Sequence, residues 1–236
     1  MEIEKLFDQY AEKLLNNTVL KVKENQYRIC EIEMYYYHTD HPDEYTHRDQ
    51  IQLEQRRFYP HRFKNGTYKS GTYKCLDITF GNKERNIYFG ILIRSIMNIK
   101  TGNFISGPCL CVNELLKQYS CSEFAEFLKN YQIDQEFILE EKRLSFQAIY
   151  IGPRVGLGNK YPNYREKKYR YAIHINKIKK QKIFEIRTTQ QKEEKAEEKD
   201  EKKIEWKIVF SDDEDDKEED EKVEKEENGR KDRKKI

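Results

Sequence analysis

The stretch YRICEIEMYYYH, residues 27–38, decides the fold of this chain. Alternate residues of a β-strand point to opposite faces, so the stretch can be sorted by parity. One face has a core-like set, Cys30, Ile32, Met34 and Tyr36. The other face has two carboxylates beside two aromatic rings, Glu31, Glu33, Tyr35 and Tyr37. A solvent-exposed strand face with cross-strand salt bridges is the plain structural explanation for the second set.

A second apolar run, NIYFGILIRSIMNI over residues 86–99, predicts a central strand with little access to water. Arg94 lies within it. A buried guanidinium is costly unless a carboxylate pairs with it. We therefore expect Arg94 to face Glu31 or Glu33 across the sheet, an arrangement that a purely structural ion pair would also satisfy.

The remaining pattern predicts the fold class. Apolar residues at helical spacing predict a helix over residues 3–16, and two more are expected, at about residues 112–119 and after Ser120, which has capping-box spacing to Glu123. The segments rich in strand-forming residues are 27–37, 72–80, 87–99, 144–150 and 169–175. Because strands and helices come in blocks, we expect an α+β fold with a curved, largely antiparallel sheet flanked by helices.

Two regions differ in composition. Residues 1–187 have the apolar content of one domain, whereas residues 188–236 have so many charges that we expect a disordered tail. An apolar island, IEWKIVF over residues 204–210, interrupts the tail and is followed by acidic residues. A β-prone run before acidic residues resembles a SUMO-interacting motif over residues 204–216. An incidental apolar patch and a last strand of the domain explain the island equally well.

Composition also indicates in which compartment the protein resides and which kind of partner it binds. No apolar stretch is long enough to cross a bilayer and the charged start is unlike a secretory signal, so we expect a soluble intracellular monomer without a membrane partner. The five cysteines are irregularly spaced, which predicts reduced thiols. The net charge of +2 combines a basic domain with an acidic tail, and a basic domain fits a polyanionic partner.

Glycines and histidines give weaker signals. GPRVGLG, residues 152–158, allows a backbone to come close to another group, but it lacks the Gly-Lys-Ser/Thr ending of a phosphate-binding loop. The spacing of the histidines matches no familiar metal site, so no metal or cofactor is predicted.

Five segments together resemble the 3-methyladenine (alkyladenine) DNA glycosylase family. YRICEIEMYY is similar to that family's catalytic strand, roughly R-I-V-E-x-E-A-Y. The other four follow in the same order: GTYKCLDITFG (71–81), GILIRSI (90–96), ISGPCLCVNELL (105–116), and GPRVGLG with KYRYAI (152–173). The resemblance implies a base-excision repair enzyme that flips alkylated or damaged purines out of duplex DNA and hydrolyses the N-glycosidic bond, without a cofactor. It would be nuclear in a eukaryote and cytoplasmic otherwise.

The resemblance also implies roles for individual residues. Glu33 falls on the acid that activates water, and Arg94 on the arginine that helps to hold that water. Tyr35 matches the aromatic residue that stacks on the extruded base. His47 matches the histidine that closes the pocket, with His41 as the alternative.

One position departs from the family's pattern, and another matches it but can also be explained as part of the core. The second stacking tyrosine falls near Leu76 or Asp77, so Tyr73 is the expected substitute. Phe80 aligns with the aromatic wedge that fills the gap left in the duplex, and a core phenylalanine is the alternative.

Other functions remain open beside the glycosylase. A non-catalytic nucleic-acid or chromatin binder would keep the fold and the basic surface, and an RNA-directed or nucleoside hydrolase would use Glu33 on another substrate. A lyase activity would require an amine near the sugar, and Lys69 and Lys74 are interpreted as ordinary surface lysines.

Overall fold

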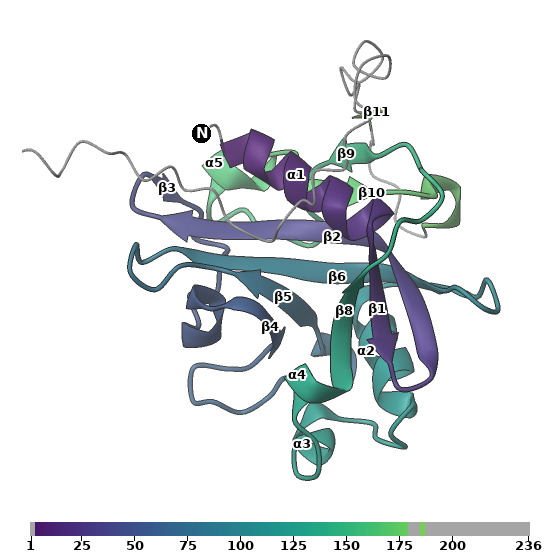
Figure 1. Cartoon of the computed structure of the whole chain (residues 1–236). Coiled ribbons are helices and arrows are strands. Elements are labelled where there is room, and N and C mark those ends of the chain that lie inside the picture. The colour runs from purple at the N-terminus through teal and green to yellow at the C-terminus, as the bar shows by residue number, and fades with distance from the viewer. Residues whose placement is uncertain (1–2, 179–184, 187–236) are drawn as a thin grey trace, which may run out of the picture. The chain divides into compact units, whose positions relative to one another are not determined.

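The computed structural model describes residues 3–178 and 185–186 (Figure 1). They form an α+β structure with few helices around a curled antiparallel half-barrel sheet, which confirms the expected fold class. The helices are α1 (Ile3–Asn16), α2 (Pro108–Lys117) and the single turns α3 (Phe124–Phe127), α4 (Ile133–Glu136) and α5 (Pro162–Arg165). The short 3-10 helices are η1 (Gln50–Leu53), η2 (Gly71–Tyr73) and η3 (Ile175–Lys177). The predicted charged tail, the apolar island and the SUMO-like motif lie outside the described residues.

The sheet is built around two long strands, β2 (Asn25–His38) and β6 (Tyr88–Asn98). The main path runs β11-β9-β10-β2-β6-β5-β4, and β1, β3, β7 and β8 join it from the side. The other strands are β1 (Thr18–Val22), β3 (His41–Pro42), β4 (Gln55–Pro60), β5 (Leu76–Phe80), β7 (Phe104–Ser106), β8 (Phe137–Glu141), β9 (Tyr150–Gly152), β10 (Arg170–Ala172) and β11 (Glu185–Ile186).

Helix α1 covers one face of the sheet and lies along β2 (Figure 1). Its apolar stripe is fully buried at Phe7, Leu14 and Leu15. The ring of Phe7 packs edge-on against Tyr36, with 6.1 Å between the ring centroids. The face of β2 that the sequence assigned to the core is therefore the face under α1, and Glu33 and Tyr35 point to the opposite face.

Strands β2 and β6 each carry one bulged residue at the same level. Their register runs from Ile29 opposite Ile96 to Ile32 opposite Ile93, which leaves Cys30 and Arg94 without a directly opposite residue. A bulge bends the strand and re-aims the side chains around it. This irregularity lies beside both carboxylates of the central strand.

Several predicted boundaries are wrong for local reasons. The strand expected from residue 72 begins at Leu76, because Gly71–Tyr73 form a 3-10 turn with Gly71 at φ 60°. Most of the strand expected over residues 144–150 is irregular, and β9 begins only at Tyr150. The capping box at Ser120 does not form, since Ser120 has a left-handed φ of 56° and the N-cap of α3 is Glu123.

The cysteines and the lengths of the helices bear on two expectations drawn from composition. None of the five cysteines forms a disulfide in the structure, and Cys30 and Cys111 are buried. Among the described residues, no helix combines the length and the apolar character that a bilayer span requires.

Candidate functional site

The two carboxylates of the central strand are buried. Glu33 is 0% exposed and Glu31 is 1% exposed, although they lie on the face of β2 opposite α1. A solvent-exposed strand face is therefore the wrong explanation for these acids. Because an ionised carboxylate is costly to bury, each one needs partners.

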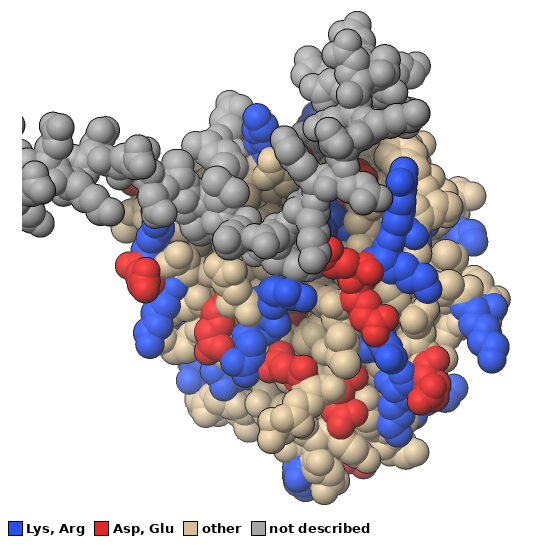
Figure 2. Space-filling model, viewed as in Figure 1, with Lys and Arg blue, Asp and Glu red and all other residues tan. Residues whose placement is uncertain are grey.

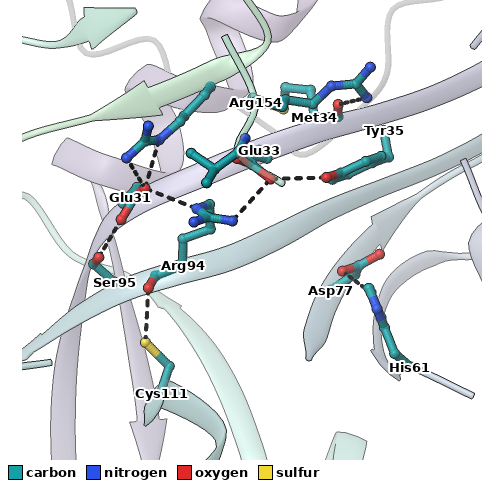
Figure 3. A network of polar contacts seen from close by, with 12 residues as sticks. Glu31, Glu33, Met34, Tyr35, His61, Asp77, Arg94, Ser95, Cys111 and Arg154 are labelled. Carbon is teal, nitrogen blue, oxygen red and sulfur yellow. Dashed lines mark hydrogen bonds and ion pairs between the residues drawn. The ribbon is translucent and has the colours of Figure 1, made fainter. Parts of the chain in front are cut away.

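Arg94 pairs with both carboxylates, which confirms the expectation drawn from its apolar surroundings (Figure 3). Its Nε donates to Glu31 Oε1 at 2.9 Å, and its Nη1 lies 3.3 Å from Glu33 Oε2. Glu31 receives a second guanidinium, because Arg170 on β10 donates from Nε to the same Oε1 at 2.7 Å. Glu31 Oε2 accepts from the hydroxyl of Ser95. Glu31 on β2 is thus bound to side chains of β6 and β10, and its carboxylate links these three strands.

Glu33 has a different set of partners. Its Oε1 accepts the backbone N–H of Val155 at 2.7 Å, and its Oε2 accepts the hydroxyl of Tyr35 at 2.9 Å. Burial raises the pKa of Glu33, and Arg94, the Val155 N–H and the Tyr35 hydroxyl oppose that rise by favouring the ionised form. A buried carboxylate with a raised pKa is a better proton acceptor than an ordinary glutamate when it is ionised. In the arrangement seen here, both of its oxygens already have donors.

A buried arginine packs against the ring of Tyr35. The guanidinium carbon of Arg154 lies 4.6 Å from the centroid of the Tyr35 ring. Arg154 Nη1 donates to Asp43 Oδ2 at 2.6 Å. It also donates to the carbonyl of Met34 at 3.0 Å (Figure 3). Sequence reasoning missed Arg154 and Asp43 as supports, and the arginine within GPRVGLG was the signal that could have suggested them.

A second polar group lies on the same side of the sheet, across β6. His61 Nε2 is 2.6 Å from Asp77 Oδ1, and both residues are buried (Figure 3). His47, the expected pocket histidine, is exposed; its ring lies 4.5 Å from that of His61, and its Nδ1 lies 3.1 Å from the hydroxyl of Tyr59. His47 therefore belongs to the group around His61 and is not among the contacts of Glu33.

The other predicted residues lie apart from both groups. Tyr73 is 75% exposed on the η2 turn, which packs near α2, and it is not among the contacts of Tyr35. Phe80 is 2% exposed and packs against Tyr10 of α1, with 4.5 Å between ring centroids. A wedge must be exposed to enter a duplex, so Phe80 as placed here is a core residue. His41 lies under α1, with Nε2 2.9 Å from the hydroxyl of Tyr169.

A small surface cavity of about 240 Å³ lies away from Glu33, between β4 and β8. Its lining consists of Arg56, Phe58, Asp134, Phe137, Ile138 and Leu139. On the face of the molecule shown in Figure 2, lysines and arginines alternate with acidic residues instead of forming one basic patch.

Comparison with known proteins gives a relative without a named activity. No family model matches the chain. The chain is 42% identical over 196 residues to the "Uncharacterized protein L759" of Acanthamoeba polyphaga mimivirus, and the match covers 76% of this chain and 91% of the viral protein. At that identity and coverage, the chain belongs to the same family as this mimivirus protein.

Proposed function

We propose that this protein is a monofunctional DNA N-glycosylase that removes alkylated or otherwise damaged purines by base flipping. One observation carries the proposal: the hydroxyl of Tyr35 and the guanidinium of Arg94, which come from two strands, lie 2.9 Å and 3.3 Å from the same buried carboxylate oxygen, Glu33 Oε2. A carboxylate, a guanidinium and an aromatic ring are the groups that water activation and base stacking require.

In the proposed reaction, the extruded base stacks on Tyr35 and Glu33 accepts a proton from a water molecule. The water oxygen forms a bond to C1′ of the sugar while the bond from C1′ to the base nitrogen breaks. The electron pair of that bond leaves with the base. The sugar passes through an oxocarbenium-like state, which the negative charge of Glu33 stabilises. Arg94 keeps Glu33 ionised and orients its carboxylate.

The reaction requires water to reach a carboxylate that is 0% exposed. Because the carboxylate is enclosed, the side chain of Tyr35 or the backbone at Val155 has to move aside for a water molecule to reach it. The segment after Val155 is suited to such a shift, since Gly156 has a φ of +79° and the Cβ positions of Gly156 and Gly158 face open space. Stacking of a base on Tyr35 provides the driving interaction for the rearrangement.

The same burial favours a second function, a nucleic-acid binder that keeps the fold without the reaction. In that protein, Glu33 would be a structural partner of Arg94, Tyr35 and Val155. Binding would then be independent of damage and steeply dependent on salt.

An excision assay separates the two functions. Duplex oligonucleotides carrying hypoxanthine, ethenoadenine or 3-methyladenine are incubated with the protein, and alkali-labile abasic sites are counted. We expect product from the wild type and a loss of about 100-fold or more for Glu33→Gln, because the amide cannot accept the proton. DNA affinity, measured by fluorescence anisotropy, should stay within about twofold for this variant, since the phosphate contacts are untouched.

Glu141→Gln is the matched control, because Glu141 pairs with Lys13 at the surface, 2.7 Å away. This variant should retain full excision. Equal excision by the Glu33→Gln variant would refute Glu33 as the base. Damage-independent binding without product from the wild type would establish the binder instead.

A further inference from the structure

Cys75 and His61 lie opposite each other where the loop between β4 and β5 begins. Pro60 of β4 pairs with Leu76 of β5 in an antiparallel register. The pairing continues by one residue, because the backbone N–H of His61 donates to the carbonyl of Cys75 at 3.0 Å. Opposite residues of an antiparallel pair project from the same face, with their Cβ atoms about 4.5–5.5 Å apart. The thiol of Cys75 and the imidazole of His61 are therefore neighbours.

Asp77 binds the other side of the same imidazole. It follows Cys75 by two residues, so both side chains lie on one face of the extended chain. His61 Nε2 is 2.6 Å from Asp77 Oδ1 (Figure 3). An imidazolium can donate from both ring nitrogens, so Nδ1 is the one that can serve Cys75. A thiol, an imidazole and an orienting carboxylate thus follow one another in the order that nucleophilic cysteines use.

The imidazole of His61 is charged at neutral pH. Burial lowers its pKa, but the charge and hydrogen bond of Asp77, followed by those of Cys75, outweigh burial and raise it to about 9. A positive charge beside a thiol favours the thiolate, which is the form that attacks other sulfur atoms. The surroundings of Cys75 therefore promote reaction at its sulfur.

Cys75 combines access to solvent with an imidazolium partner, and the other cysteines do not share this combination. Cys30 and Cys111 are buried. Cys109 and Cys121 are half-buried, as Cys75 is, but each of their thiols donates to a backbone carbonyl, at 3.2 Å and 3.4 Å. The chain thus contains its own comparison thiols for Cys75.

The segment between His61 and Cys75 is basic. Residues 62–74 contain no aspartate or glutamate, and their basic residues are Arg62, Lys64, Lys69 and Lys74. Arg62 and Lys74 form ion pairs with carboxylates, whereas in the part of the chain that the structure describes no carboxylate lies within ion-pair distance of Lys64 or Lys69. The uncompensated positive charge near the thiol attracts an anionic reactant.

We propose that Cys75, with His61 and Asp77, forms a thiol–disulfide exchange site that takes up a small anionic disulfide. The sulfur of Cys75 attacks one sulfur of the disulfide R–S–S–R, and a bond forms between these two atoms. The S–S bond of the reactant breaks, and its electron pair leaves with R–S⁻, which ends as R–SH with the proton of the Cys75 thiol. Cys75 is oxidised to a mixed disulfide and the departing sulfur is reduced, so the disulfide itself is the oxidant. His61 stabilises the negative charge that moves between the sulfurs.

Two disulfides of opposite charge test the site in the full-length wild type. Glutathione disulfide is anionic and cystamine is cationic. Each is added at pH 7, and mass spectrometry of the peptides gives the rate of mixed-disulfide formation at Cys75 and at Cys121. We expect Cys75 to react about 10-fold faster than Cys121 with glutathione disulfide. Replacing both free lysines, Lys64→Gln with Lys69→Gln, should lower the rate with glutathione disulfide relative to the rate with cystamine.

His61→Gln keeps a hydrogen-bond donor beside the thiol and removes the charge. Its Cys75 should react about 10-fold more slowly with iodoacetamide, a neutral reagent that reports on the thiolate alone. His38→Gln is the matched control, because His38 also lies near an aspartate, Asp40, at 3.5 Å, and it should keep the wild-type rate. The buried Cys30 reports on folding, since it is modified only when a variant unfolds.

The wild-type comparison decides the proposal even if His61→Gln does not fold. A Cys75 that reacts no faster than Cys121 with glutathione disulfide would overturn the exchange site. An unchanged iodoacetamide rate in a folded His61→Gln variant would also overturn it, because the imidazolium would then have no effect on the thiol. Slower reaction of Cys75 in that variant, with Cys30 still protected, would support it. Neither result depends on whether the protein excises bases.

Discussion

At the scale of single residues, Glu31 and Glu33 show how two identical side chains on one strand acquire different chemistry. Glu31 is paired with two guanidinium groups, whereas Glu33 shares one of them and takes neutral donors for the rest. Both oxygens of Glu31 are thus taken up by partners within the sheet, the two guanidinium groups on Oε1 and the Ser95 hydroxyl on Oε2. Glu33 has fewer cations and a raised pKa, and it is the better candidate for acid–base work.

A pH prediction belongs to His61. Burial lowers the pKa of His61, but the charge and hydrogen bond of Asp77 outweigh burial and raise it from 6.5 to about 9 in the folded protein. The ion pair therefore adds stability that is fully present below pH 6.5. This stability is lost as the pH rises through the folded pKa. The loss is on the order of 3 kcal/mol, from about 1.4 kcal/mol per pKa unit.

Urea unfolding of the wild type and of His61→Gln at pH 6 and pH 10 measures this loss. The difference in unfolding free energy between the two proteins should shrink at the higher pH, because the wild type alone loses the pair. Tyrosines and lysines also titrate in this range, and subtracting the variant removes their contribution. A difference that is the same at both pH values would contradict a charged His61.

Much of the carboxylate group is predictable from local sequence. The parity of residues 27–38 and the apolar run around Arg94 were enough to predict the ion pair. The partners that come from far along the chain were not predictable, since Val155 is 122 residues from Glu33 and Arg170 is 139 residues from Glu31. Such contacts depend on which segment pairs with β2, and periodicity does not encode that choice.

At the scale of elements, the long strands and α1 were predicted because their patterns are long and regular. The short strands β1 and β8 were missed because five residues each carry little periodic signal. The paired bulges at Cys30 and Arg94 were also missed, because they arise from tertiary contacts. They matter because they lie where both carboxylates meet Arg94.

The close packing of Gln52 and Asp77 over Gly90 supports a stability prediction. Gly90→Ala places a methyl group 2.5 Å from Gln52 Nε2 and 2.6 Å from Asp77 Oδ2, so one or both side chains must move. We expect a loss of about 1–3 kcal/mol in unfolding free energy, the usual cost of overpacking. Gly158→Ala is the control, because its Cβ would face open space, and it should change stability by about 0.5 kcal/mol or less. Equal effects of the two variants would show that the space over Gly90 is not filled as described.

At the scale of the whole molecule, charge is divided between two parts of the chain. The net charge of +2 is the sum of a basic body and a C-terminal stretch with more acidic than basic residues. Under the proposed function, the acidic stretch would oppose DNA binding, since acidic residues repel phosphates and basic residues attract them. Affinity for DNA should therefore depend on both parts, whereas the residues that surround Glu33 belong to the first alone.

Truncation after residue 189 tests this division, because it keeps every described element, including β11, which pairs with β9. We expect the unfolding free energy to stay within about 0.5 kcal/mol of that of the full chain, the range for changes outside the core. Excision should also be unchanged, while DNA binding at low salt becomes tighter as the acidic repulsion is removed. Residues 190–236 hold 14 Lys and Arg against 20 Asp and Glu, so a matched chain in which six of these acids are replaced by amides has no net charge in this stretch and should bind about as tightly as the truncated protein. A marked loss of stability on truncation would contradict the disordered tail and would assign the apolar run at 204–210 to the domain as a strand.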